Sequence, residues 1–393
     1  MASQRKQIFI IGGTGAQGVP VVEALTRDQA YSVRILTRNL ESPRAQKLAQ
    51  LPHVELVKGS LDKDEDLRKG FHGCWGAFVN LDGFVIGQKN ELFWGIRSYQ
   101  LAQEAGVKFF VWGNLDYVSR DGNYDPQFRT GHYDIKGIVG DWILSQTKWH
   151  AERAQTFPSR ERTSMGAALF TTGPYLDMVL ASHTIMTPTI ASDGVVEWRV
   201  PLHDGAVAHI ALEDCGKYVR WQFDNAYTSD GKPGRASGLD LAVATEHVRY
   251  TDLAAAFSKV TGKSARCIDM DEDEYWDLYP ELRGYKFGKD YAGMRDDDGS
   301  LLTWQTNFAG FWHMWQHSGG EDPLIKRDYK LLDEILPDRV KSVEEWFTKH
   351  KDLCMAVAEG KLEPVLKLHE DRQLVRDKQV KANGPSSEYP LHE

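Results

Sequence analysis

Residues 7–25, QIFIIGGTGAQGVPVVEAL, decide how the chain is expected to fold. Four consecutive apolar residues, Ile8 to Ile11, lead directly into a glycine-rich turn, and an apolar-periodic segment follows the turn. This order predicts a strand, a tight turn and a helix. Gly12, Gly15 and Gly18 have GxxGxxG spacing, in which the first gap is one residue longer than in the common GxGxxG pattern.

Glycines at this spacing let the backbone turn sharply and approach a pyrophosphate without obstruction by Cβ atoms. The N–H groups of the helix's first turn then face the anion. Pro20 fits such a first turn, because the N–H groups there lack helical partners. A glycine motif alone is a weak signal and a purely structural turn is the alternative, but a strand before it and a helix after it favour a phosphate-binding unit.

Composition limits the class of protein further. The chain has 393 residues and a formal net charge of −9, without a basic block interleaved with aromatic residues, so nucleic acid is not an expected partner. No apolar run approaches the roughly 20 residues that span a bilayer, and the start MASQRKQ lacks the apolar segment of a secretory signal. We therefore expect a cytoplasmic protein without a membrane partner. The four cysteines are far apart, which favours reduced thiols over disulfides or a metal site.

The next two predicted strands carry candidate cofactor residues at their ends. Tyr31 to Thr37 reads as a strand that ends at Arg38, where an NAD-selective site would place an acid for the ribose hydroxyls. Arg38 can instead pair with a 2′-phosphate, so we expect NADP(H); the alternative is a surface arginine. Val54 to Val57 is a short third strand, after which Asp62 is expected either near the adenine or as the N-cap of a helix that starts near Lys63.

Two more strands complete a parallel sheet. Trp75 to Leu81 reads as the fourth strand, and its end at Asn80 and Leu81 falls on the edge of the crevice where a dinucleotide lies. A helix from about Lys89 to Ala105 and a fifth strand from Val107 to Trp112 follow. Alternating strands and helices predict an α/β fold with a doubly wound parallel sheet of the Rossmann type.

His132 and Lys136 form the candidate catalytic pair. A spacing of four on a helix places both side chains on one face. Lys136 is expected to hold the nicotinamide ribose, and His132 to donate a proton near neutral pH. Tyr133 and Asp134 are alternative proton donors. The competing interpretation is a helix with a solvated polar face.

Several segments together resemble the NmrA-like family of atypical short-chain dehydrogenases/reductases, a fungal type of NAD(P)-binding Rossmann protein. The matching segments are GGTGAQG at 12–18, TRN at 37–39, GSLDKDEDL at 59–67, HYDIK at 132–136, ALEDCGKYV at 211–219, VRYTDLAAAFSKVTGK at 248–263 and RDYKLLDEILPDRVKSVEEW at 327–346. The resemblance implies NADP(H) in a Rossmann domain, with a small C-terminal domain over the nicotinamide. Some members of the family are reductases of small molecules, and others are redox-sensing regulators without turnover.

The resemblance also assigns residues to the parts of the cofactor. It implies the pyrophosphate at Gly12, Thr14, Gly15, Gln17 and Gly18, the 2′-phosphate at Arg38, the adenine at Asp62, the dinucleotide beside Asn80 and Leu81, and the nicotinamide ribose at Lys136. Two features depart from typical short-chain dehydrogenases. The tyrosine of their YxxxK pair is His132 here, and their catalytic serine has no clear counterpart around Gly113 and Asn114. These departures concern the proton donor and leave the cofactor assignment unchanged.

The second half of the chain is expected to enclose the substrate. Phe170 to Met178 resembles the loop that passes the nicotinamide, and Pro174 and Tyr175 are candidates for lining its pocket. We expect a strand of the smaller domain at 194–201 and a strand returning to the main sheet at 239–244. The predicted division is a Rossmann domain at 1–168, with strands returning from about 195–245, a substrate domain at 169–350, and a polar, helical extension at 351–393.

An aromatic stripe marks the region before that extension. Its residues recur at three- and four-residue steps, which predicts one face of a helix, and they are Trp304, Phe308, Phe311, Trp312 and Trp315. Packing in the core is the default role for such a stripe, and a wall for a flat substrate is the alternative. The glycine- and charge-rich segment at 283–298 is a candidate lid, and the acidic run at 269–274 indicates a helix N-terminus more than a metal site.

The sequence thus leads to two hypotheses of different classes. The first is an NADP(H)-dependent oxidoreductase that transfers hydride to or from a C=N, C=O or activated C=C bond of a small aromatic metabolite, in secondary metabolism of the alkaloid type, with a variant in which the pocket also guides a stereoselective cyclisation. The second is an NADP(H)-sensing regulator without turnover that acts through a protein partner.

Overall fold

A seven-stranded, fully parallel sheet forms the centre of the computed structural model, which describes residues 5–156, 165–291, 293–295 and 297–368. The strands lie in the order β10-β6-β5-β4-β1-β2-β3. Their bounds are β1 Lys6–Ile11, β2 Tyr31–Thr37, β3 Val54–Lys58, β4 Gly76–Val79, β5 Phe109–Leu115, β6 Gly166–Thr172 and β10 Asp240–Ala242. The strand order reverses between β1 and β4, which is where doubly wound folds bind their ligands. The predicted Rossmann-type sheet is therefore confirmed.

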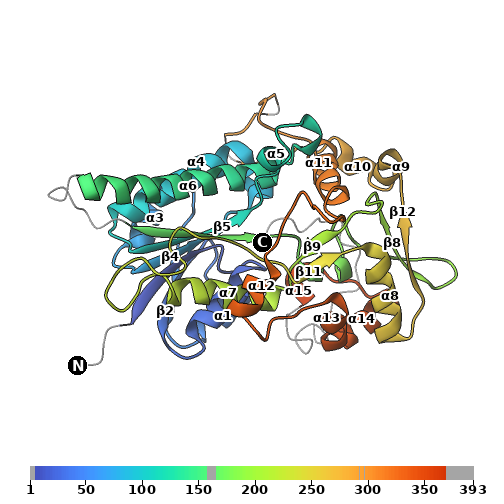
Figure 1. Ribbon diagram of the computed structural model, residues 1–393, viewed down its shortest axis with the longest axis horizontal. Helices are drawn as coiled ribbons and strands as arrows, with labels where there is room; N and C mark the ends of the chain where they lie inside the picture. The colour runs from blue at the N-terminus through green and yellow to red at the C-terminus, as the bar shows by residue number, and fades with distance from the viewer. Residues whose placement is uncertain (1–4, 157–164, 292, 296, 369–393) are drawn as a thin grey trace.

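Helices cover both faces of this sheet (Figure 1). One face packs against α3 Asp64–Phe71, α4 Gly83–Glu104 and α6 Gly131–Thr156. The other face packs against α1 Gly18–Thr26, α2 Pro43–Ala49, α7 Leu212–Asp224 and α12 Tyr329–Ile335. The strands are apolar on both faces because both faces are buried, as in β6, where all seven residues are buried.

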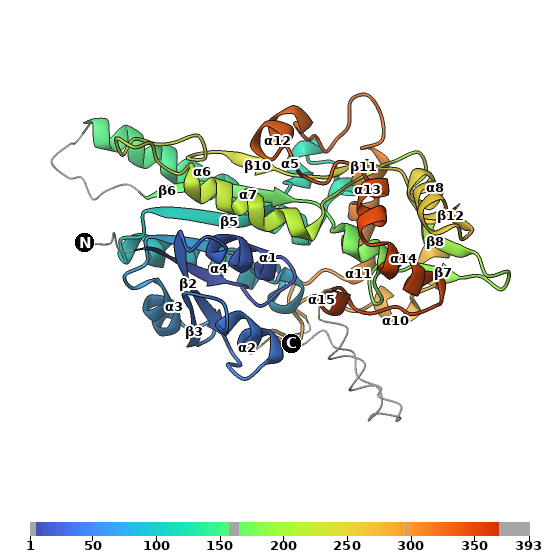
Figure 2. The ribbon, with the colours of Figure 1, turned by 90° about the horizontal axis from the view of Figure 1, so that it is seen from below.

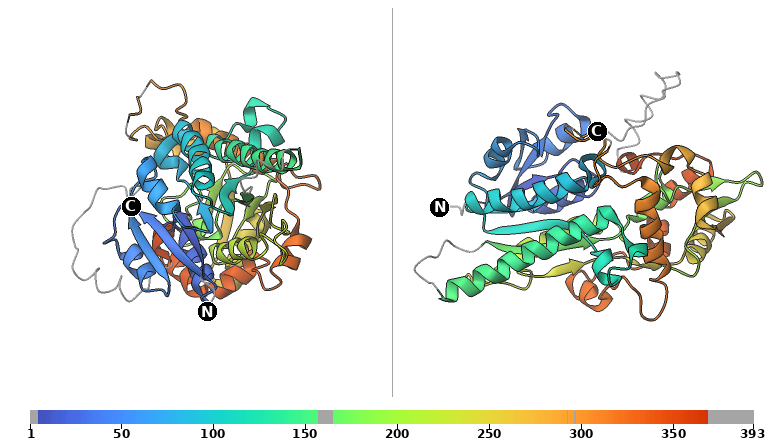
Figure 3. Two further views of the ribbon diagram at one scale, coloured as in Figure 1. Left: turned by 90° about the vertical axis from the view of Figure 1, so that its left-hand side faces the viewer. Right: turned by 90° about the horizontal axis from the view of Figure 1, so that it is seen from above.

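A second body of chain lies beyond the carboxyl ends of these strands, at the end of the molecule away from the N-terminus (Figure 2 and the right-hand view of Figure 3). It contains two small sheets, in the orders β11-β9 and β12-β8-β7. Its strands are β7 Thr189–Ile190, β8 Val196–Val200, β9 Val207–His209, β11 Glu246–Val248 and β12 Ala265–Asp269. Its helices are α8 Tyr250–Thr261, α9 Glu272–Asp277, α10 Pro280–Arg283, α11 Trp304–Gln316, α13 Val343–Lys349, α14 Lys351–Ala358 and α15 Val365–Leu368.

This second body has its own apolar core, to which Trp198 of β8, Phe257 of α8 and Trp312 of α11 contribute. Short helical turns join it to the main sheet: α5 Val118–Asp121, and two 3₁₀ turns at Pro126–Phe128 and Leu176–Leu180. The strand expected at 194–201 lies in the separate three-stranded sheet, and the strand expected at 239–244 joins the main sheet as β10. The domain boundaries stay a prediction, and residues 369–393 of the expected extension lie outside the described residues.

The helix expected from about Lys89 is confirmed as the main part of α4, which a kink at Gly87, with non-helical φ 74° and ψ 163°, separates from a short helical turn that begins at Gly83. One local alternative was wrong. Asp62 is not the N-cap of α3, because the helix begins at Asp64 and Lys63 occupies the cap position. The turn before α3 is instead stabilised by Asp66, whose carboxylate accepts a hydrogen bond from the Ser60 N–H at 3.0 Å.

Candidate functional site

The glycine turn between β1 and α1 is shaped by close backbone packing. Gly12 has φ +84°, and a Cβ atom there would lie 2.5 Å from the Asn80 carbonyl oxygen. A Cβ atom on Gly18 would lie 2.0 Å from the Gly12 oxygen, whereas one on Gly15 would lie 3.3 Å from the same oxygen. No side chain therefore fits at Gly12 or Gly18, whereas a Cβ atom at Gly15 would make only a tight contact.

The helix that follows has an open N-terminus. Gln17 occupies the N-cap of α1 without capping it through its side chain, and the first turn carries no acidic residue. The Gln17 Oε1 is buried, and none of the described residues donates a hydrogen bond to it. Uncapped N–H groups and the positive end of the helix dipole are the features that bind phosphate. The turn therefore fits the pyrophosphate of a dinucleotide.

Arg38 and Asp62 lie at the carboxyl ends of two neighbouring strands, β2 and β3. Arg38 is exposed, and within the described part of the chain it makes no hydrogen bond or ion pair, which leaves its guanidinium available for an anion. Asp62 is half-buried, and its Oδ1 has no hydrogen-bond partner among the same residues. These positions suit the roles expected at the 2′-phosphate and the adenine.

Lys136, in the second turn of α6, is held in a buried ion pair that the sequence did not reveal. Its Nζ lies 2.8 Å from the Oε1 of Glu91 on α4, and the two side chains are 10% and 1% exposed. The Glu91 carboxylate receives no well-directed hydrogen bond from the described residues, so the contact is an ion pair. Burial raises the pKa of Glu91, and the Lys136 charge opposes this shift.

The other partners of Lys136 place it in the crevice. Its Nζ donates to the Leu81 carbonyl at 2.8 Å, to the Asn80 Oδ1 at 3.2 Å and to the Gly113 carbonyl at 3.4 Å. Asn80 and Leu81 follow β4 directly, and Gly113 belongs to β5. Lys136, Asn80 and Leu81 therefore meet at the carboxyl end of β4, and their roles at the dinucleotide stay a prediction.

His132 is enclosed by aromatic rings and bound to an amide. Its ring centroid lies 4.8 Å from Phe84 and 5.2 Å from Phe308. Its Nδ1 lies 3.1 Å from the Asn307 Oδ1, and its backbone N–H donates to the same oxygen at 3.2 Å. Burial lowers the pKa of His132 to about 4; the Asn307 contact opposes the shift and the Lys136 charge adds to it. His132 is therefore neutral at pH 7, unlike the proton donor near neutrality that the sequence led us to expect.

Tyr133 and Asp134 point into packed protein. Tyr133 is 2% exposed and packs against Phe311 and Trp315 of α11, and burial raises the pKa of its phenol well above the usual range. Asp134 accepts hydrogen bonds from the Ser119 N–H and hydroxyl, both at 2.7 Å, and from the Thr130 N–H at 3.0 Å. These contacts give Asp134 a structural role at the start of α6. Of the three alternatives, His132 is the one whose ring lies against Phe84, at 4.8 Å.

Pro174 and Tyr175 reach the crevice from the end of β6. The Pro174 carbonyl accepts hydrogen bonds from the Ile210 N–H at 3.0 Å and from the His209 Nδ1 at 3.2 Å, which fixes the loop to β9. Tyr175 is half-buried, and burial raises the pKa of its phenol, with a contribution from the charge of Asp82. The loop is therefore held against the residue that follows β9.

A small aromatic hollow of about 90 Å³ lies at the start of α4. It is lined by Asp82, Phe84, Val85, Tyr285, Phe287, Gly288, Asp290 and Trp304. Phe84 is 37% exposed, and its ring stacks on Trp304 at 5.9 Å and on Phe308 at 6.1 Å. Of the aromatic stripe of α11, Phe308, Phe311, Trp312 and Trp315 are buried core residues, as expected by default, whereas Trp304 lines the hollow.

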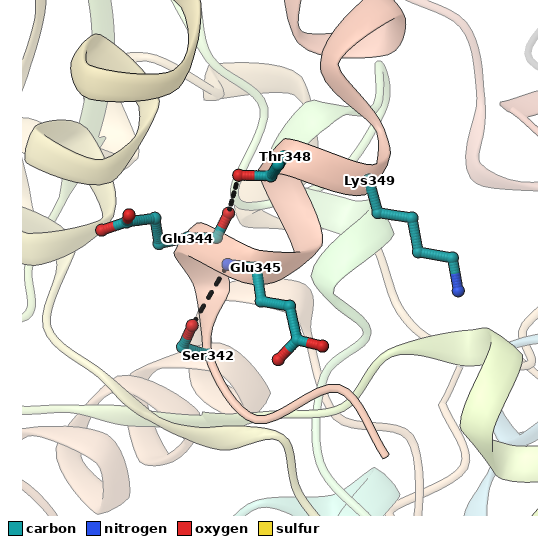
Figure 4. A pocket seen from close by; sticks show the side chains of 5 residues that line it. All are labelled: Ser342, Glu344, Glu345, Thr348 and Lys349. Carbon is teal, nitrogen blue, oxygen red and sulfur yellow. Dashed lines mark hydrogen bonds between the residues drawn. The ribbon is translucent and has the colours of Figure 1, made fainter. Parts of the chain in front are cut away.

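A larger surface hollow, of about 400 Å³, lies elsewhere, on α13 (Figure 4). It is lined by Ser342, Glu344, Glu345, Thr348 and Lys349. Two of these side chains serve their own helix, since the Ser342 hydroxyl accepts from the Glu345 N–H at 3.1 Å and the Thr348 hydroxyl donates to the Glu344 carbonyl at 2.8 Å. None of the predicted site residues lines this hollow.

Two further observations concern metal binding and membrane spans. Within the described residues, no cluster of three or more His, Cys, Asp or Glu side chains could hold a metal ion. In the same part of the chain, no helix combines the length and the apolar character needed to cross a bilayer.

A reversing parallel sheet with a glycine turn at its switch point defines the class as a Rossmann-type, NAD(P)-binding fold. Residues 4–289 match the NmrA-like family, and the chain belongs to that family. The NmrA-like oxidoreductase malD of Malbranchea aurantiaca is 33% identical over 367 residues, which cover 89% of this chain and 98% of malD. The NmrA-like oxidoreductase lnaB of Aspergillus flavus is 28% identical over 275 residues, which cover 68% of this chain and 76% of lnaB.

Solved structures agree with this assignment at the level of the fold. NmrA, a negative transcriptional regulator solved in complex with NADP, superposes with a TM-score of 0.59 at 16% identity and covers 88% of this chain and 95% of its own. The NADPH-dependent quinone oxidoreductase QOR2 of Escherichia coli, solved with NADPH, gives 0.61 at 18% identity and covers 88% and 99%. The cofactor bound in both is the one expected here from Arg38 and the glycine turn.

Proposed function

We propose that this protein is an NADP(H)-dependent oxidoreductase that acts on a C=N, C=O or activated C=C bond of a small aromatic metabolite, in secondary metabolism of the alkaloid type. The observation that carries the proposal is the placement of Lys136 at the carboxyl end of β4, four residues after His132, whose ring lies 4.8 Å from Phe84 of the aromatic hollow. NADP(H), when bound, supplies or accepts hydride. Gly12, Gly18 and Arg38 would hold its phosphates, and Lys136 its nicotinamide ribose.

The protein's own groups limit which electrophile suits the site. Hydride addition to a neutral C=O or C=N bond requires a proton as well, whereas hydride addition to an iminium ion gives a neutral amine without one. His132 is neutral at pH 7, and the charge of Lys136 is compensated by Glu91. An iminium substrate is therefore favoured. The same aromatic walls would also orient such an intermediate for a stereoselective cyclisation.

The test measures binding and turnover together. NADPH and NADH are titrated by fluorescence, and NADPH absorbance is then followed with a panel of aromatic iminium ions, imines, ketones and enones. We expect tight NADPH binding that Arg38→Asp weakens selectively, and oxidation that Lys136→Ala abolishes. Equal affinity for NADH would contradict the role given to Arg38. A single product stereoisomer formed without NADPH consumption would identify the cyclisation.

The second candidate is an NADP(H)-sensing regulator that acts through a protein partner. It is favoured by the state of two of the expected proton donors: burial lowers the pKa of His132 to about 4, and the Asp134 carboxylate accepts hydrogen bonds from Ser119 and Thr130. Tight NADPH binding without consumption across the whole panel would support this candidate, and a pull-down that depends on NADPH would then identify the partner.

A further inference from the structure

The aromatic hollow at the start of α4 is built from two parts of the chain that are far apart in sequence. Asp82 and Phe84 come from the N-cap and the first turn of α4, whereas the segment 285–290 and Trp304 come from the second body. The Gly288 N–H donates to the Phe84 carbonyl at 3.2 Å and joins the two parts. The hollow thus lies where the second body contacts the first turn of α4.

Backbone pairing fixes the part of the hollow that comes from the second body. The Trp304 N–H donates to the Tyr285 carbonyl at 2.8 Å, and Lys286 and Thr303 form an antiparallel bridge beside this bond. Successive residues of an extended chain point to opposite faces, so residues two apart share a face. Tyr285 and Phe287 accordingly lie on the same side, and both line the hollow.

Three rings form one continuous wall of the hollow. The ring centroids of Phe84 and Phe287 lie 4.9 Å apart, those of Phe287 and Trp304 lie 4.8 Å apart, and Phe84 stacks on Trp304 at 5.9 Å. The face of an aromatic ring is electron-rich and attracts cations. The Tyr285 ring already shows this interaction, because the Lys289 Nζ lies 4.5 Å from its centroid.

Two carboxylates add negative charge beside the aromatic wall. The Asp82 Oδ1 accepts hydrogen bonds from the Phe84 N–H at 3.1 Å and the Val85 N–H at 3.3 Å. The Asp290 Oδ2 accepts a hydrogen bond from the Tyr285 hydroxyl at 3.0 Å. Both acids are exposed, and neither forms an ion pair with another described residue. Their remaining oxygens are therefore available to a ligand that enters the hollow.

The cations around the hollow are largely committed to other partners. Lys136 and Arg38 attract the Asp82 carboxylate from a distance. The Glu91 carboxylate, 2.8 Å from the Lys136 Nζ, compensates the first of these charges, and the cofactor's 2′-phosphate would compensate the second. The hollow then keeps the charges of its two carboxylates, opposed by that of Lys289. Its electrostatics favour a cation over a neutral group of the same size.

We propose that the hollow binds the positively charged nitrogen group of the substrate, an ammonium or iminium group, between the aromatic wall and the carboxylates of Asp82 and Asp290. The volume of about 90 Å³ is smaller than the roughly 150 Å³ that accommodate a benzene ring, so the charged group enters and the aromatic body of the substrate stays outside the hollow. This inference rests on the proposed oxidoreductase function, but binding of the cation does not depend on hydride transfer.

The test uses two small probes of similar size, of which one is charged. Tetramethylammonium chloride and tert-butanol each give a single methyl proton resonance, and the broadening of that resonance is measured as the full-length protein is added at constant ionic strength. We expect the cation to bind at least about tenfold more tightly than tert-butanol, because the aromatic faces and the carboxylates attract only the charged probe.

Two charge-removing variants locate the bound cation. Asp82→Asn and Asp290→Asn each remove one charge and keep an oxygen that can accept the hydrogen bonds of the wild-type side chain. Each should weaken tetramethylammonium binding by about threefold to fivefold and leave tert-butanol binding unchanged. Asp328→Asn is the matched control, because Asp328 caps α12 through the Leu331 N–H at 2.9 Å, as Asp82 caps α4, but does not line the hollow. It should leave both affinities unchanged.

Absence of tetramethylammonium binding, or equal binding of the two probes, would overturn the inference. Tetramethylammonium binding that neither hollow variant weakens would overturn it as well, because the cation would then lie elsewhere. Cation binding that both variants weaken, without NADPH oxidation in the presence of any substrate of the panel, would refute the oxidoreductase and leave the cation subsite standing. Turnover of neutral ketones without cation binding would do the reverse.

Discussion

The buried pair of Glu91 and Lys136 provides the sharpest test of the site's construction. At an Nζ–Oε1 distance of 2.8 Å the attraction is about 6 kcal/mol for an effective dielectric constant of about 20. The cost of removing both charges from water offsets most of this attraction, so the loss of one partner matters more than the loss of the pair. Glu91→Gln should therefore cost about 3 kcal/mol of unfolding free energy, the low end of the usual range, because three carbonyl-type oxygens still contact the ammonium.

Lys136→Met should cost a similar amount, and the double variant Glu91→Leu/Lys136→Met should cost less than the sum of Glu91→Leu and Lys136→Met by at least about 1 kcal/mol. The assay is urea unfolding at pH 7 followed by tryptophan fluorescence, with linear extrapolation. Single effects that add within about 0.5 kcal/mol in the double variant would refute the coupling.

The pH dependence of Lys136→Met supplies an internal control. Without the lysine charge, the pKa of Glu91 in the folded protein rises further above its ordinary 4.5. The folded state then binds more protons than the unfolded state between those two values, so its stability falls as the pH rises through this window. Lys136→Met should therefore be closer to wild type at pH 5 than at pH 8, and the opposite order would contradict a buried, ionised Glu91.

Three further predictions use other parts of the molecule. Because the pKa of His132 is lowered from 6.5 to about 4, its contribution to stability is present above pH 6.5 and is lost as the pH falls; His132→Gln should lose less stability than wild type between pH 7 and pH 5 in urea titrations. Gly18→Ala should abolish NADPH binding measured by fluorescence, whereas Gly15→Ala should only weaken it, since the added Cβ atoms would lie 2.0 Å and 3.3 Å from a backbone oxygen. Arg327→Leu should cost about 3–5 kcal/mol in urea unfolding, because it leaves Asp116, which Arg327 pairs with twice at 2.7 and 2.8 Å, without its buried partner.

Local patterns in the sequence were sufficient for most of the main sheet. The strand expected at Tyr31 to Thr37 is β2 with the same bounds. An alternating apolar run between two polar turns is a local pattern, so the segment alone predicts both ends of the strand. The aromatic stripe likewise predicted α11, since three- and four-residue spacing is a property of the segment itself. The short helical turn at the start of α4 was missed, because a kink at Gly87, which has positive φ, separates it from the regular helix that the pattern predicts.

The candidate site, too, could be predicted only where local pattern and topology decide the position of a residue. Residues at the carboxyl ends of parallel strands, such as Arg38 and Asn80, could be placed from topology alone, because all such ends meet at one edge. Glu91 and Asn307 could not be placed. Asn307 is 175 positions from His132 in the chain, and its role depends on how α11 docks on α6. No local pattern contains that information, so long-range partners of a catalytic group appear only in the folded structure.

Those long-range partners change the chemistry more than the predicted residues do. In a YxxxK site the lysine charge lowers the pKa of the tyrosine, which can then exchange a proton near neutral pH. Here the lysine charge is compensated by Glu91, and the tyrosine is replaced by His132, whose pKa of about 4 makes it a poor acid at pH 7. A site with neither an acid nor an uncompensated cation gives little help to a developing alkoxide and does not repel a positively charged electrophile. The same substitutions that weaken the case for carbonyl reduction therefore strengthen the case for an iminium substrate.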